Sequence, residues 1–279
     1  MLELEHRFRV VDVHARLPVE ESVTARGRAI SPDKLEREFH QAGVVNAIVF
    51  PGPVQEGSSY LRANNAVARR SVERPFFTFA RINGPRDPDG SATARFRNFR
   101  THRKDWHTSP EDVEQYAYDD RFHGFKLDPT HDGLPDDDVL DRLEDVDLPV
   151  LVTAGDGFPP ETAATTLLDR SFPVVLSHFG GFPLNRDLME DAIDLLDSHD
   201  DCYLDTSFVR YREQMERAVM EHPDRVLFGS GAPHAHPNVA VMEILTLDVP
   251  EDAMRKVFTN NPCRVVERSR RTNDRSLTG

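Results

Sequence analysis

Basic, histidine and acidic side chains stand at the ends of several short apolar segments of this chain. His14 and Arg16 close the first segment, Lys126 closes another, and His178 and Asp205 end two later ones. Imidazole and carboxylate groups can move protons, whereas guanidinium and ammonium groups bind carboxylates. These residue types indicate chemistry on a small anionic molecule, provided that the fold brings the segment ends together.

Eight short apolar runs alternate with helical segments along the sequence. The runs are mostly continuous, which is typical of strands buried on both faces. Helix-start signals lie between them, because Ser31-Pro32 and Ser109-Pro110 each offer a capping residue followed by proline. This pattern predicts an α/β fold, a single (β/α)8 TIM barrel. The runs are residues 8–14, 44–50, 76–82, 122–127, 149–153, 174–178, 202–206 and 226–230.

In a TIM barrel the carboxyl ends of all eight strands meet at one mouth. Arg16, Arg81 and Lys126 would gather there, and three cations in an acidic chain would attract a carboxylated ligand. A doubly wound sheet is the alternative fold. Its dinucleotide-binding form needs a glycine-rich turn after an early strand, and the sequence has none.

One stretch departs from the regular alternation of strands and helices. We expect one barrel domain over residues 1–268, with an elaborated loop at about 83–108 and a polar tail at 269–279. The loop contains the single tryptophan and a basic segment, residues 95–104. That segment fits either a solvated surface helix or a lid or subunit contact.

Composition narrows the class of protein. The net charge of −14 argues against nucleic acid as a partner. No apolar run reaches the roughly 18 residues of a membrane span, and the first ten residues lack the apolar block of a signal peptide. We therefore expect a cytoplasmic protein with no membrane partner. The chain has 48 acidic residues and only four lysines, which indicates a halophilic protein whose surface stays hydrated at high salt.

Four motifs carry a resemblance to a known family: SHFGG, YLDTS, FGSGAP and NNPCRVV. Together they resemble the amidohydrolase-related TIM barrels, a branch that includes aminocarboxymuconate semialdehyde decarboxylase and pyrone-dicarboxylate lactonase. The resemblance runs from Val11 to about Val266. It implies hydrolysis or non-oxidative decarboxylation of a small carboxylated substrate, often by a homodimer. His178 matches the family's catalytic histidine.

The chain departs from the family at its metal ligands. The family begins D-x-H-x-H, but here His14 is followed by Arg16, which cannot be a ligand because it stays protonated. Thr153 replaces a second histidine and Gly231 replaces the strand-eight carboxylate. With three of four usual ligands missing, we expect a degenerate active site that binds no metal or other cofactor at the inherited position.

The resemblance then implies these roles. An active chain would be metal-independent or of reduced activity. The predicted catalytic residues are His178 and Asp205, and the predicted substrate-binding residues are Arg16, Arg81 and Lys126.

Two alternatives remain open. One divalent metal ion, zinc, could bind in a shifted site made of His14, His178, His234 and His236, since His234-Ala235-His236 places two imidazoles close together. The barrel could instead be a non-catalytic pseudoenzyme that acts as a binding or assembly partner. Whether the chain is an enzyme is not decided by its sequence.

Overall fold

The computed structural model of the chain describes residues 7–24, 27–89 and 91–267. Eight parallel strands form one sheet, in the order β1 (Val10–Arg16), β4 (Val44–Phe50), β5 (Phe76–Ile82), β6 (Phe122–Leu127), β7 (Val150–Gly155), β8 (Val174–Phe182), β9 (Cys202–Asp205) and β10 (Val226–Leu227). The Val13 N–H donates to Phe228 O at 2.9 Å and the Arg16 N–H donates to Ala232 O at 2.8 Å. These bonds join the two edges of the sheet, so the predicted single TIM barrel is confirmed.

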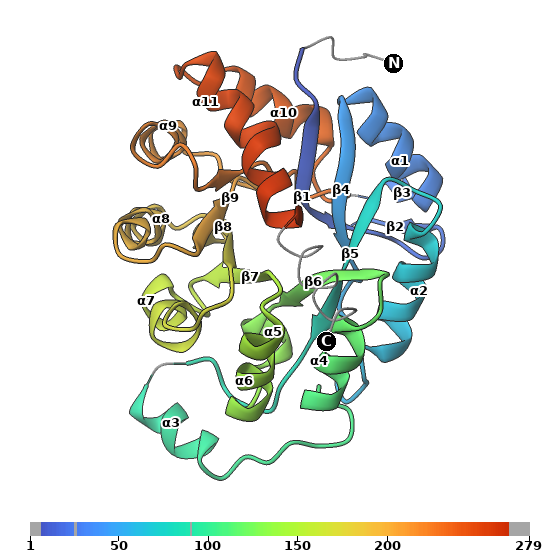
Figure 1. Cartoon of the computed structure of the whole chain (residues 1–279), viewed down its shortest axis with the longest axis vertical. Helices are drawn as coiled ribbons and strands as arrows, with labels where there is room; N and C mark the ends of the chain where they lie inside the picture. Colours follow the sequence, from blue (N-terminus) through green and yellow to red (C-terminus); the bar gives the residue numbers. More distant parts are fainter. Residues whose placement is uncertain (1–6, 25–26, 90, 268–279) are drawn as a thin grey trace, which may run out of the picture.

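Helices surround the barrel between successive strands (Figure 1). The Ser31 hydroxyl accepts a hydrogen bond from the Lys34 N–H at the start of α1 (Pro32–Gln41), which satisfies a backbone donor that the helix leaves unpaired. Among the described residues, no helix combines the length and apolar character needed to cross a membrane. The remaining helices are α2 (Leu61–Ser71), α3 (Ala92–Asn98), α4 (Pro110–Ala117), α5 (Pro129–Asp132), α6 (Asp137–Val146), α7 (Pro160–Ala163), α8 (Arg186–Asp194), α9 (Arg212–Glu221), α10 (Pro237–Leu245) and α11 (Glu251–Arg255).

Two groups of buried apolar side chains fill the molecule. Along β4, Val49 belongs to the larger group, whereas Ile48 and Phe50 belong to the smaller one. Side chains of a strand alternate between its faces, so the larger group packs against the helices and the smaller fills the barrel interior. Val265 and Val266 also pack into the smaller group. A filled interior leaves ligand space at the mouth of the barrel rather than through it.

Residues 83–108 form the long connection between β5 and α4. This connection carries α3, which projects away from the barrel in Figure 1. Its ends are tied together, because the Asn83 N–H donates to Thr108 Oγ1 at 3.0 Å and the Thr108 N–H donates to Asn83 Oδ1 at 2.9 Å. The domain boundary at residue 268 stays a prediction, and the predicted tail at 269–279 lies outside the described residues.

Candidate active site

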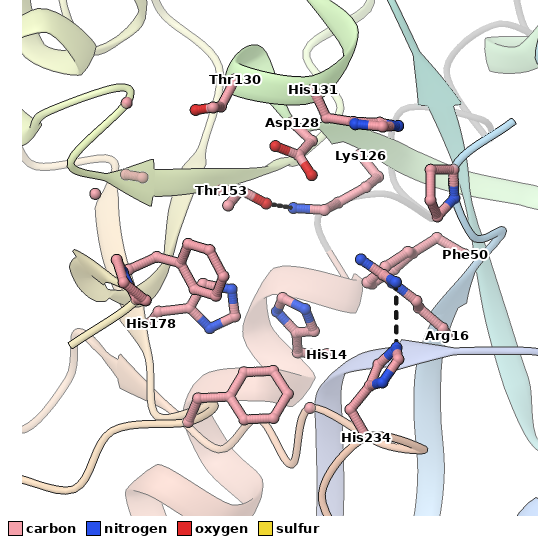
Figure 2. A pocket seen from close by; sticks show the side chains of 18 of the residues that line it. His14, Arg16, Phe50, Lys126, Asp128, Thr130, His131, Thr153, His178 and His234 are labelled. Atoms are coloured by element: carbon pink, nitrogen blue, oxygen red, sulfur yellow. Dashed lines mark hydrogen bonds between the residues drawn. The ribbon is translucent and has the colours of Figure 1, made fainter. Parts of the chain in front are cut away.

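A cavity of about 630 Å³ opens at the carboxyl ends of the barrel strands. Its wall combines imidazoles, basic side chains and phenylalanine rings drawn from several different strands and from the loops that follow them (Figure 2). The lining residues used below are His14, Arg16, Phe50, Arg81, Lys126, Asp128, His178, Phe182, Phe208 and His234.

His14, His178 and Asp205 form a buried cluster, and its two imidazoles line this cavity. Each of the three offers one ligand atom, and these atoms all lie within 4.8 Å of one another. His14 Nδ1 and Asp205 Oδ2 are 2.9 Å apart, so the imidazole from β1 is held by the carboxylate from β9. The two imidazole rings are also close, with centroids 4.9 Å apart.

Backbone geometry fixes the orientation of His178. Its Nδ1 lies 3.0 Å from Ser207 O, and because a carbonyl only accepts, Nδ1 carries the proton. The φ angles of His178 and Phe179 are 61° and 52°, a left-handed conformation that few such residues adopt. Each of the two rings offers one nitrogen as a possible metal-ligand atom.

The electrostatics of the cluster suit a cation. Burial lowers the pKa of His14, and burial together with the neighbouring His14 lowers the pKa of His178 to about 3. Burial alone would raise the pKa of Asp205, but its electrostatic interaction and hydrogen bond with His14 hold it well below its usual value. Two neutral imidazoles and one carboxylate are the protonation states that metal ligands require, so the donor set fits a divalent ion.

Arg16 and Lys126 supply positive charge to the cavity. Arg16 Nη1 lies 3.2 Å from His234 Nε2, and Lys126 Nζ lies 2.7 Å from Thr153 Oγ1. Within the described ranges, neither cation forms an ion pair with a carboxylate. Both charges are therefore available to an anionic ligand.

Arg81 lies in the cavity wall but is already neutralised. Its Nε donates to Asp132 Oδ2 at 2.7 Å, and its Nη2 donates to Asp128 Oδ2 at 3.3 Å. The Tyr60 hydroxyl also donates to Asp132, at 2.6 Å. Of the three predicted substrate-binding cations, Arg81 is thus the one that acidic neighbours already hold.

Phe208 occupies the space next to Gly231, where the family places a carboxylate. Gly231 has a φ of 71°, and a Cβ atom added there would lie 2.7 Å from the Phe208 ring. Reasoning from the sequence overlooked Phe208 and Phe182 as cavity walls and Ser207 as a support. The YLDTS motif ends at Ser207, but nothing in it shows that the next side chain turns into the mouth.

The expectation that the chain binds no metal or other cofactor is wrong. It rested on counting inherited positions, and it did not foresee that Asp205 would reach His14 across the mouth and complete a three-residue ligand group. The shifted zinc site is corrected too. His14 and His178 do lie together, but His234 contacts Arg16, and His236 accepts a hydrogen bond from the Asn238 N–H at the start of α10.

Comparisons with known proteins agree with this fold. A family model described as Amidohydrolase matches residues 11–268. No curated protein gives a significant match.

Three solved structures show how the fold is shared. An uncharacterised TIM-barrel protein from Bordetella bronchiseptica is 18% identical, covering 93% of this chain and 99% of its own, with a TM-score of 0.67. The 2,6-dihydroxybenzoate decarboxylase from Rhizobium is 16% identical, covering 94% of this chain and 99% of its own, with a TM-score of 0.65. The dihydroxybenzoic acid decarboxylase from Polaromonas, with bound manganese and 2-nitroresorcinol, is 14% identical. It covers 94% of this chain and 97% of its own, with a TM-score of 0.63. At these identities the likeness establishes the fold alone.

Proposed function

The chain belongs to the amidohydrolase family, and we propose that it removes carboxylate from a small aromatic acid, as carbon dioxide, with a divalent metal ion at the barrel mouth. One observation carries the proposal: the imidazoles of the buried His14, His178 and Asp205 cluster line the same cavity as the unpaired cations Arg16 and Lys126. Ligands for a metal ion and binding groups for a carboxylate are thus present together.

The three residues of the cluster would hold the ion. Manganese is our first candidate, because the Polaromonas decarboxylase of the same fold is described with that metal bound. A bound divalent ion would polarise a substrate oxygen as a Lewis acid. His178 and Asp205 keep their proposed catalytic role in this account, as ligands of the ion rather than as free bases.

The cavity suits an aromatic acid in size and polarity. Its volume of about 630 Å³ is ordinary for a small-molecule site. Arg16 stays charged at any physiological pH and would bind the carboxylate through two parallel hydrogen bonds. Phe182 and Phe208 offer ring faces to an aromatic ligand. These walls, with the decarboxylases among the similar folds, favour decarboxylation over hydrolysis.

Decarboxylation replaces a carbon–carboxylate bond by a carbon–hydrogen bond, so a proton must reach that carbon. Lys126 Nζ is the proposed carrier. Burial lowers the pKa of Lys126 to about 7, which lets this group give and take a proton near neutral pH.

Turnover of 2,6-dihydroxybenzoate by the manganese-loaded protein tests the proposal. We expect resorcinol and carbon dioxide as products, measured by chromatography and gas release. His178→Ala should lower kcat by about 100-fold or more, since it removes one of three metal ligands. His40→Ala is the matched control, because His40 is exposed at the opposite end of the barrel, just before β4. Binding without turnover, for this acid and related carboxylated phenols, would contradict the proposal and favour a pseudoenzyme.

A further inference from the structure

The side chain of Lys126 can act as a nucleophile as well as a cation. We propose that its amine also captures the carbonyl group of an oxo acid as a covalent imine, with Arg16 holding the acid's carboxylate. The inference rests on the proposed binding of carboxylates in this cavity. It adds a second class of ligand, oxo acids, and a nucleophilic role for a residue so far treated as a cation.

The hydrogen bonds of Lys126 permit its neutral form. Its Nζ lies 2.7 Å from Thr153 Oγ1 and 3.2 Å from Leu127 O. A hydroxyl can accept a hydrogen bond from an ammonium group or donate one to an amine, whereas a carboxylate partner would hold the charged form. No carboxylate in the described residues forms an ion pair with Lys126.

The surroundings of Lys126 also disfavour its charge. The residue is only 2% exposed. Burial has the largest effect on its pKa, and Arg81 and Arg16 lower it further, while Asp128 and Asp205 act in the opposite direction. The resulting pKa of about 7 leaves near half of the side chain as free amine at neutral pH. An ordinary lysine is less than about one part in a thousand amine there.

The same cavity offers the second group that an oxo acid needs. Arg16 and Lys126 enter it from β1 and β6, and both head groups lie on its wall (Figure 2). An oxo acid carries a carboxylate and a ketone within a few bonds of each other. With its carboxylate on Arg16, its carbonyl carbon would face the amine, which is the arrangement that activated lysines use.

The step is a condensation. The Lys126 nitrogen forms a bond to the carbonyl carbon, and one of its two protons passes to the carbonyl oxygen to give a neutral carbinolamine. The carbon–oxygen bond then breaks, the hydroxyl leaves as water with the second nitrogen proton, and a carbon–nitrogen double bond forms. Asp128 follows on the same strand end and lines the same cavity, so its carboxylate can accept each proton from nitrogen and pass it to oxygen.

Reductive trapping tests this inference. The protein would be incubated with benzoylformate, an aromatic oxo acid, and then treated with sodium borohydride, which reduces an imine to a stable secondary amine. Intact-mass measurement and peptide mapping should show one reduced adduct per chain, on Lys126. Lys126→Arg keeps the charge but loses the nucleophile, so it should form no adduct. Lys256→Arg is the matched control and should be labelled like the wild type, since Lys256 pairs with Asp224 at 3.0 Å.

Calorimetric titration with benzoate separates this inference from the proposed function. If benzoate binds the wild type but no adduct forms, or if labelling persists in Lys126→Arg, the nucleophilic role is overturned and the carboxylate site stands. If benzoate does not bind at all, the proposed function fails as well. Benzoate binding by Lys126→Arg would show that this variant keeps a folded cavity.

Discussion

At the scale of single residues, the site places two neutral imidazoles and one carboxylate beside unpaired positive charge. His14 and His178 are held through Nδ1 and lie beside the carboxylate of Asp205, while Arg16 and Lys126 face the same cavity. The identity of these residues can be read from sequence. Their partners cannot, because the contact between His14 and Asp205 joins positions 191 residues apart.

The titration of the Lys126 amine should make the affinity for anionic ligands depend on pH. Because its pKa in the folded protein is about 7, far below that of an exposed lysine, its ammonium form is present below about pH 7 and lost above it. Benzoate should therefore bind about tenfold more weakly at pH 8.5 than at pH 6, by loss of a charge-assisted hydrogen bond worth about 1.5–3 kcal/mol. Calorimetry across this range checks the trend. Lys126→Arg should bind almost independently of pH, and an unchanged slope in that variant would rule out Lys126 as the titrating group.

The position of Phe208 lets us predict how restoring the family's carboxylate at residue 231 would change the stability of the protein. Gly231→Asp should destabilise the protein by about 1–3 kcal/mol, because position 231 is left-handed and its Cβ would meet the Phe208 ring. Urea unfolding measures this free energy. In a Phe208→Ala background the same substitution should cost less, since the ring is gone. Equal costs in both backgrounds would mean that the ring does not obstruct this position.

At the scale of elements, the barrel strands were predictable because they are buried on both faces. Six predicted strand ranges lie within two residues of the observed ones at each end, but β8 runs to Phe182 rather than His178. The extension follows the left-handed residues at 178 and 179, which the sequence does not reveal. β10 is also shorter than predicted, at Val226–Leu227. The neighbouring strand β1 forms hydrogen bonds instead with the loop that follows β10, near the cavity.

The side chain of Asn261 anchors the last strand, β10. Its buried side chain donates to Pro223 O at 2.9 Å and to Val226 O at 2.8 Å, tying β10 to the closing helical segment. Asn261→Ala should lower the free energy of unfolding by about 1–3 kcal/mol, because two buried acceptors lose their donor. Asn260→Ala, at an exposed position, is the control and should change stability by less than about 0.5 kcal/mol. Similar losses in the two variants would contradict this anchoring role.

At the scale of the whole molecule, acidity is the dominant property. The net charge of −14 is spread over a chain whose basic residues are nearly all arginine. Most of the ion pairs in the described residues involve side chains that are partly exposed, and such pairs contribute little to stability. Repulsion among the excess carboxylates should therefore outweigh the stabilisation that these ion pairs provide. Salt adaptation and a homodimer stay predictions.

Salt should stabilise the fold. Raising potassium chloride from about 0.1 M to 1 M shortens the screening length from about 10 Å to about 3 Å, which weakens repulsion among the excess carboxylates. We expect the thermal midpoint to rise by several degrees, on the order of 1 kcal/mol. Differential scanning calorimetry measures this midpoint. A fall with added salt would mean that the surface ion pairs dominate.

Manganese binding to chelator-treated protein is the measurement that tests the central claim most directly. Calorimetric titration should show saturable binding of one ion per chain. His14→Ala and His178→Ala should abolish it, and His40→Ala should leave it unchanged, because only the first two remove ligands from the buried cluster. Absence of saturable binding of manganese or zinc by the wild type, or undiminished binding by both cluster variants, would contradict a metal site at His14, His178 and Asp205.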